Sequence, residues 1–216
     1  MSERVAIVAG AGGELGRVTA EKLAAAGYTV AGVDRSQEGL KELPDGIRRE
    51  AADPADPAAA RSVVDRIAAE VGPPEVLVNT VGMYRLGEAL TATPEDLRLM
   101  IDVNVGAALW LTQAVVPYLR ERGSGSIVHV TARPGLEPTA GMAAYAVSKA
   151  ALAYLTRVLD LELRPLGIRV NAASPQQLDT AKTHAVTPEA VADIIVYLVS
   201  DAAAPVSGAV VPAYGA

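Results

Sequence analysis

The sequence predicts a single α/β domain, residues 1–216, with a doubly wound parallel sheet of about seven strands and helices on both faces. Short apolar runs alternate with helical patterns from one end of the chain to the other. A length of 216 residues suits one domain with a full core. Hydrophobic residues make up 50% of the chain but aromatic residues only 4%, so the core must consist of Ala, Val, Leu and Ile, as in a sheet buried on both faces.

The elements follow one another in a regular order. The expected strands are the apolar runs 5–9, 29–33, 47–52, 76–79, 126–131, 168–173 and 209–211. Between them lie the expected helices 14–26, 57–71, 94–122, 144–164 and 188–200, with a shorter helical segment at 37–43. Asp56 can cap the helix that Pro57 opens. A repeat of this kind predicts parallel strands joined by right-handed crossovers.

The composition excludes several functions. The formal net charge is -6 and no basic run exceeds two residues, so nucleic acid and anionic membranes are not expected partners. The absence of Cys excludes disulfides, thiolate zinc sites and a cysteine nucleophile, and we predict no metal centre. The first strand leaves no room for a signal peptide and no apolar run reaches transmembrane length, so we expect a cytoplasmic protein.

A glycine-rich loop connects the first expected strand to the first expected helix. Gly10, Gly13 and Gly16 follow one another at intervals of three. Glu14 and Leu15 lie between the last two, and Leu15 breaks the more usual G-x-G-x-x-G spacing. Glycines let a backbone approach a pyrophosphate, and a helix N-terminus attracts the anion. The loop predicts a Rossmann-like nucleotide site, although a glycine loop after a strand can be a simple turn.

The end of the second strand indicates which cofactor is bound. Asp34 can accept hydrogen bonds from an adenosine ribose and would repel a 2′-phosphate. The sequence therefore favours NAD(H) over NADP(H). Arg35 argues in the opposite direction because its guanidinium could attract that phosphate. The alternative is a surface Asp–Arg pair in a turn.

One helix carries a candidate catalytic pair. Tyr145 and Lys149 are four residues apart, so they share a helix face. A free tyrosine has a pKa near ~10, and a neighbouring ammonium lowers it. Such a pair can move a proton while a hydride is transferred. The spacing also arises by chance on ordinary helix surfaces.

Taken together, the motifs resemble the short-chain dehydrogenase/reductase family along nearly the whole chain. The glycine loop, Asp34 and the Tyr145/Lys149 pair occur in the family's order. Further residues typical of the family follow in the same order: Asp53, the segment Asn79-Thr80-Val81-Gly82, Asn104, the segment 125–128, the segment 169–171 and Pro175.

The resemblance assigns roles to these residues. It implies that Asp53 lies near the adenine, and that Asn79, with Val81 and Gly82, holds the fourth strand and the cofactor. It implies that Asn104 anchors a helix and a water of the proton relay, and that Lys149 also holds the nicotinamide ribose. Residues flanking the nicotinamide would be Pro175 and Thr180.

The sequence departs from the family pattern at several positions. Minor departures are Ala9, Glu14, Thr80, Val81 and Gln176. The major departure is Ala132, which lies thirteen residues before Tyr145, at the position where the family has a serine. Strand alternation points Thr131 and His129 away from this site, so we expect His129 to be packed rather than catalytic. Arg133 is a candidate to replace the missing serine as a hydrogen-bond donor, but we expect Arg133 to be a solvated loop residue.

The substrate side also has particular features. The stretch 181–187 is too short to build a helical lid, so we expect an open pocket near Met83, Tyr84, Met142 and Gln176. His184 lies in this stretch, where an exposed loop histidine is expected. The segments 136–142 and 177–180, together with Ala132, look like the dihydropteridine reductases within the family.

These observations predict an NAD(H)-dependent oxidoreductase acting on a small carbonyl or quinonoid substrate, with Tyr145, Lys149 and Asn104 as catalytic residues. The alternatives are a cofactor-binding sensor or scaffold, motivated by Ala132, and a lyase or isomerase on the same fold. Surplus apolar residues on the helices 94–122 and 144–164 predict a homodimer or homotetramer.

Overall fold

The computed structural model describes residues 4–176 and 186–215. Seven parallel strands form one sheet in the order β3-β2-β1-β4-β5-β6-β7. Their bounds are β1 Val5–Ala9, β2 Thr29–Asp34, β3 Arg48–Ala51, β4 Pro74–Asn79, β5 Gly125–Val130, β6 Ile168–Pro175 and β7 Val210–Ala213. The predicted parallel α/β sheet is therefore confirmed.

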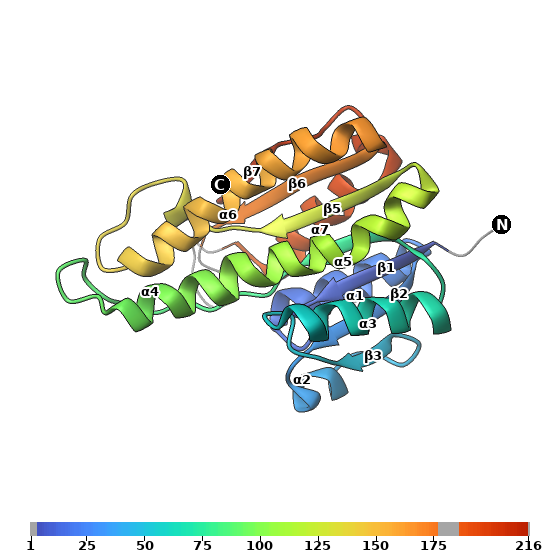
Figure 1. Ribbon diagram of the computed structural model, residues 1–216, viewed down its shortest axis with the longest axis horizontal. Coiled ribbons are helices and arrows are strands. Elements are labelled where there is room, and N and C mark those ends of the chain that lie inside the picture. Colours follow the sequence, from blue (N-terminus) through green and yellow to red (C-terminus); the bar gives the residue numbers. More distant parts are fainter. Residues whose placement is uncertain (1–3, 177–185, 216) are drawn as a thin grey trace.

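Helices cover both faces of this sheet (Figure 1). Their bounds are α1 Glu14–Ala25, α2 Gln37–Lys41, α3 Pro57–Glu70, α4 Pro94–Ile101, α5 Ala107–Arg122, α6 Ala143–Leu163 and α7 Pro188–Val199. One core cluster joins α1 and α7 to Val8, Val30 and Val128. The other joins α3, α5 and α6 to residues that alternate with these along the strands, such as Ile7 and Ile127. Alternation along each strand thus divides the core into two layers.

The order of the strands reverses at β1. From β1 the chain proceeds outward through β2 to β3, then returns to the other side of β1 and proceeds from β4 to β7. Doubly wound sheets bind ligands where the order reverses, at the carboxyl ends of the strands. Ala9 pairs with Val33 on one side and Asn79 on the other, so the loops after β1, β2 and β4 meet at this edge.

The long predicted helix 94–122 consists of three consecutive segments. A π-helical segment, Asp102–Gly106, separates α4 from α5. Thr93 caps α4 through a capping box with Asp96, and Asp56 caps α3 by accepting the Ala59 N–H at 2.7 Å, as predicted. The ends of some strands also differ from the predicted ends. For example, β4 begins two residues earlier than predicted, and β6 continues to Pro175.

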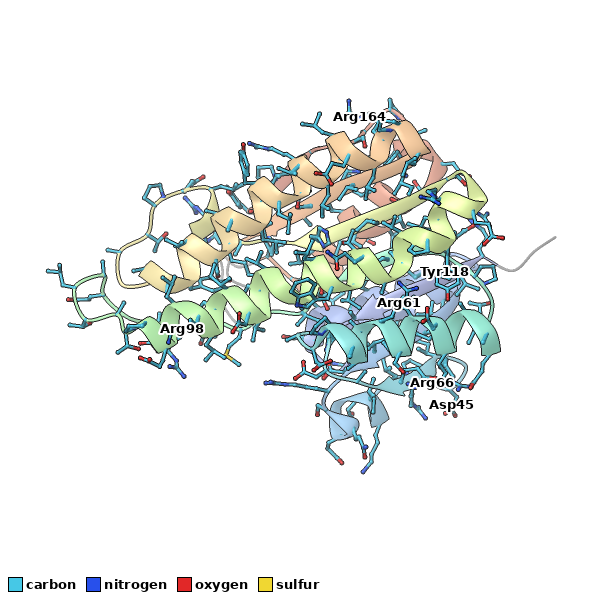
Figure 2. All side chains as sticks on the ribbon, viewed as in Figure 1. Asp45, Arg61, Arg66, Arg98, Tyr118 and Arg164 are labelled. Atoms are coloured by element: carbon cyan, nitrogen blue, oxygen red, sulfur yellow. The ribbon has the colours of Figure 1, made fainter. Side chains whose placement is uncertain are left out.

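The stretch Pro94–Arg122 is long and apolar enough to cross a membrane by length and composition alone. In this fold, however, its α5 part packs on the sheet and against α3. Figure 2 shows Arg61 of α3 and Tyr118 of α5 beside each other. Both side chains donate to the Asp65 carboxylate, at 3.1 and 2.7 Å respectively. The apolar character of this stretch is therefore that of a helix covering a core.

Candidate active site

The glycine loop folds back tightly between β1 and α1. The N–H groups of Gly10 and Ala11 donate to the Val33 carbonyl at 2.8 and 3.2 Å. A Cβ at Gly16 would lie 2.0 Å from the Gly10 carbonyl oxygen, and one at Gly10 would lie 2.6 Å from the Thr80 hydroxyl. Side chains are therefore excluded at both positions. Gly13 caps α1 without a side chain, so the first N–H groups of this helix can meet an anion.

Asp34 is held beside this loop by backbone donors. Its Oδ2 accepts the Gly12 N–H at 3.0 Å and its Oδ1 accepts the Ser36 N–H at 2.8 Å. A Cβ on Gly12 would lie 3.0 Å from the Asp34 carboxyl carbon and 3.1 Å from Gly39. The carboxylate thus occupies a narrow, fixed position at the end of β2. Arg35 is exposed and forms no ion pair within the described part of the chain.

The segment after β4 is tied to the glycine loop. Asn79 is buried and its Oδ1 accepts the Val81 N–H at 3.1 Å. The hydroxyl of Thr80 donates to the Ala9 carbonyl at 2.8 Å, which gives this departure from the family motif a clear structural role. Asp53, in contrast, is exposed, and its carboxylate accepts the local Ala55 N–H at 3.0 Å.

The π-helical segment turns Asn104 inward. Its Oδ1 accepts the Met83 N–H at 2.8 Å, while its Nδ2 donates to the Met83 carbonyl and the Ser148 hydroxyl, both at 2.9 Å. Ser148 in turn donates to the Tyr145 carbonyl at 2.7 Å. Asn104 therefore fixes the backbone of the loop after β4 against the helix that carries the candidate catalytic pair.

Tyr145 and Lys149 lie on the first two turns of α6. The Lys149 ammonium is buried and donates to the Val130 carbonyl at 2.9 Å. A Cβ on Gly82 would lie 3.0 Å from Lys149 Nζ and 3.3 Å from Asn104 Oδ1, so both side chains converge on this glycine. The ring of Tyr145 is edge-on to that of Tyr84, with centroids 6.2 Å apart. The structure thus brings Lys149 and Asn104 together and places Tyr145 one turn before Lys149 on the same helix.

The electrostatic environment of the pair differs from the prediction. Burial, reinforced by the neighbouring Tyr84, raises the pKa of Tyr145 to about 12. Burial also lowers the pKa of Lys149 to about 8. We predicted that the ammonium would lower the pKa of the tyrosine, but burial and Tyr84 raise it, and Lys149 Nζ donates to the Val130 carbonyl. At neutral pH Tyr145 is therefore a neutral phenol and Lys149 an ammonium.

The segment after β5 lacks the family hydroxyl. Ala132 is buried and precedes a short 3₁₀ turn, Arg133–Gly135. The Thr131 hydroxyl donates to the Ala173 carbonyl at 3.3 Å, as expected for a side chain directed away from the site. A Cβ on Gly135 would lie 2.6 Å from the Lys149 carbonyl carbon, so this turn packs directly on α6.

Arg133 differs from the solvated loop residue that we expected. Its Nε donates to Glu137 at 2.7 Å and its Nη1 donates to the Gln176 side chain at 3.1 Å. The guanidinium also lies 5.0 Å from the ring centroid of Tyr214. Arg133 therefore links three segments that are distant in the sequence. Tyr214 was not identified from the sequence, since nothing in the local pattern around it signals this contact.

The remaining predicted residues lie around the same edge or outside the described residues. Gly87 forms a parallel bridge with Met142, which joins the loop carrying Met83 and Tyr84 to the segment before α6. Pro175 pairs with Ala213 at the end of β6. Thr180 and His184 lie outside the described residues. Besides Tyr214, two residues of this edge were missed: Ser148, which the spacing to Tyr145 could have indicated, and Gly39, which only the fold shows.

These residues fit a nicotinamide dinucleotide. The glycine loop offers a cradle that any Cβ at Gly16 or Gly10 would fill, next to the N-terminus of α1. Asp34 stands at the adjacent strand end, where a ribose would lie. Lys149 and Asn104 converge on Gly82 after the carboxyl end of β4, whereas Asp34 ends β2 on the other side of β1.

Comparison with known proteins gives the same assignment. A family model described as short chain dehydrogenase matches residues 4–190. A short chain dehydrogenase of Pseudocercospora fijiensis is 36% identical over 82% of the chain, a match that spans 60% of that relative. The 2,3-dihydro-2,3-dihydroxybenzoate dehydrogenase of Bacillus subtilis is 34% identical over 82% of the chain and 70% of the relative.

A third relative matches over nearly its whole length. The 3-oxoacyl-(acyl-carrier-protein) reductase of Thermotoga maritima is 30% identical over 96% of the chain and 95% of the relative. Sheet topology, glycine loop and the helix of Tyr145 and Lys149 agree with these matches. The chain therefore belongs to the short chain dehydrogenase family of NAD(P)-dependent oxidoreductases.

Proposed function

We propose that this protein is an NADH-dependent reductase of a small, electron-poor substrate, with Tyr145 as proton donor, Lys149 as its electrostatic partner and Asn104 as the residue that positions both. The observation that carries the proposal is the convergence of Lys149 and Asn104 on Gly82, beside the helix turn that presents Tyr145. A bound nicotinamide would supply the hydride. The protein's own residues would bind the substrate and deliver the proton.

The preference for NADH is proposed from Asp34. Its carboxylate already accepts two backbone N–H groups, and Gly12 approaches it closely. A 2′-phosphate at this point would meet a fixed negative charge in a narrow space. Arg35 does not offset this charge, because its side chain is exposed and is not paired with Asp34.

The protonation states favour reduction over oxidation. A tyrosine with a pKa of about 12 is fully protonated at neutral pH and can donate its proton to a substrate that has accepted a hydride. The Lys149 ammonium, with a pKa of about 8, would stabilise the phenolate that remains. Asn104 holds the Met83 backbone, and through Ser148 it holds the helix turn of Tyr145.

Ala132 points to the class of substrate. A serine hydroxyl at this position would polarise a ketone oxygen, and loss of one such donor costs about 10²–10³ in rate. A quinonoid or conjugated imine needs less polarisation, because it is already electron-poor and reduction restores conjugation. The local likeness to the dihydropteridine reductases supports such a substrate.

A rate comparison tests this proposal. NADH oxidation is followed with quinonoid dihydropterin and with an aliphatic ketone, in the wild type and in Ala132→Ser. Ala140→Ser is the matched control, because it makes the same change at an exposed position of the same loop. We expect the wild type to prefer the quinonoid substrate. Ala132→Ser should raise the ketone rate more than the quinonoid rate, and the control should change neither.

Three outcomes would contradict the proposal. A wild-type preference for ketones would remove the argument from Ala132. So would equal rates for Ala132→Ser and Ala140→Ser on both substrates. Tight NADH binding without turnover of either substrate would instead support a cofactor-binding sensor.

A further inference from the structure

Buried polar side chains without partners lie on the sheet face that α5 and α6 cover. His129 of β5 is completely buried, and neither of its ring nitrogens has a hydrogen-bonding partner among the described residues. The same holds for Nδ2 of Asn79 on β4 and the hydroxyl of Ser174 on β6. Proteins seldom leave such groups unpaired, because each loses its hydrogen bonds to water on folding. Several together therefore indicate a site for a polar ligand.

The sheet register places Asn79 beside His129, with Ser174 further along the next strand. Asn79 pairs with His129, and His129 pairs with Ala172, two residues before Ser174. Neighbouring parallel strands are about 4.8 Å apart, and residues in register point to the same face. Since Oδ1 of Asn79 is occupied by the Val81 N–H, its unpaired Nδ2 is the group left to interact elsewhere. A neutral imidazole offers one donor and one acceptor beside it.

The backbone of β5 connects this polar cluster to the candidate catalytic lysine. Nζ of Lys149 donates to the carbonyl of Val130, the residue that follows His129. Burial and the Lys149 ammonium together lower the pKa of His129 to about 4, so the imidazole is neutral. Lys149 is the one ionisable neighbour that shifts this pKa. The facing residues on β4 and β6 are uncharged (Asn79, Ala172 and Ser174), and so are the buried side chains of α5, which include the Thr112 hydroxyl.

We propose that His129 and Asn79 bind ordered internal water, and that His129 is a positioning residue that keeps Lys149 charged through this water. An internal water needs two to four polar partners, and the Asn79 Nδ2, the two His129 nitrogens and the Lys149 ammonium provide them. An acceptor reached through water stabilises the ammonium form of Lys149 and opposes the effect of burial. The water site therefore raises the pKa of Lys149, the group proposed to assist Tyr145. In this respect the inference rests on the proposed function.

The test measures Lys149 directly, without turnover. The chain has four lysines, Lys22, Lys41, Lys149 and Lys182, so NMR with isotope-labelled lysine can follow each of them as pH changes. The variant His129→Leu removes both ring nitrogens, whereas His129→Asn retains hydrogen bonding at a smaller size. Tyr28→Phe is the control, since it removes an unpaired buried hydroxyl at the opposite edge of the sheet.

We expect His129→Leu to lower the pKa of Lys149 by about one unit, a tenfold loss of the charged form above that pKa. The pKa values of Lys22 and Lys41 should not move, and neither should that of Lys149 in Tyr28→Phe. His129→Asn should lie close to the wild type. An unchanged Lys149 pKa in His129→Leu would overturn the proposal.

A second measurement uses the wild type alone and is independent of how the variants fold. A high-resolution crystal structure should show water bonded to His129 and to the Asn79 amide. Dry packing of the imidazole would overturn the inference even if the protein reduces substrates as proposed. Conversely, a shift of the Lys149 pKa in a protein without turnover would preserve the inference and contradict the proposed function.

Discussion

Asp34 is the single residue on which cofactor choice depends. Because its carboxylate is fixed by Gly12 and Ser36, it cannot rotate away from a phosphate. We predict that NADH binds more tightly than NADPH, and that Asp34→Ala narrows the difference. Calorimetric titration with both cofactors measures it. Tighter binding of NADPH by the wild type would mean that Arg35 governs the site.

A second residue-level prediction concerns acid stability. His129 titrates near 6.5 in the unfolded chain but at about 4 in the fold, so the unfolded state binds more protons between these values. The free energy of unfolding should therefore fall as pH decreases from 6.5 to 4, by about 3 kcal/mol from this group. In His129→Asn this part of the loss should be absent. Urea unfolding measures this free energy at each pH. An equal decrease in the two proteins across that range would contradict the assignment.

Some single-residue features were predictable and others were not. The spacing of Tyr145 and Lys149, and the alanine thirteen residues before the tyrosine, can be read directly in the sequence. The contacts of Arg133 could not be, because Gln176 and Tyr214 reach it only through the pairing of β5, β6 and β7. The bond from Lys149 to the Val130 carbonyl, and the burial that raises the pKa of Tyr145, also depend on tertiary packing and were not foreseen.

At the scale of elements, the π-helical segment between α4 and α5 has the most direct effect on the site. It aims Asn104 at both backbone groups of Met83. Asn104→Ala should leave these groups and the Ser148 hydroxyl without their partner, which costs about 2–4 kcal/mol of unfolding free energy. Denaturant unfolding measures this, with the exposed Gln113→Ala of α5 as control. Equal free energies of unfolding for the two variants would show that the hydrogen bonds of Asn104 do not stabilise the fold.

The elements themselves were largely predictable because apolar periodicity marks them. Ranges such as 5–9 and 57–71 agree with the structure within one residue. Periodicity could not distinguish the π-helical turn within 94–122, since one extra residue per turn scarcely alters the apolar pattern over so short a segment. Nor could it place the beginning of β4, where Pro74 is buried by pairing with Val5 and the buried Glu75 is paired with Arg4 and Arg122.

The whole molecule presents an apolar surface that suggests self-association. Val147, Tyr154 and Leu161 recur at intervals of seven on α6 and are 55%, 69% and 70% exposed. We predict a homodimer or homotetramer that buries this face. Light scattering at micromolar concentration should give at least twice the monomer mass, and Tyr154→Arg should reduce it. A monomeric wild type would refute the prediction.

The central claim is that the whole fold assembles a proton donor at Tyr145. The most direct test is the rate of NADH oxidation with quinonoid dihydropterin in the wild type, in Tyr145→Phe and in the exposed control Tyr154→Phe. Removal of the Tyr145 hydroxyl should lower turnover by about 10²–10⁴-fold. The affinity for NADH should remain, and the control should retain the wild-type rate. A wild-type rate in Tyr145→Phe would contradict the account.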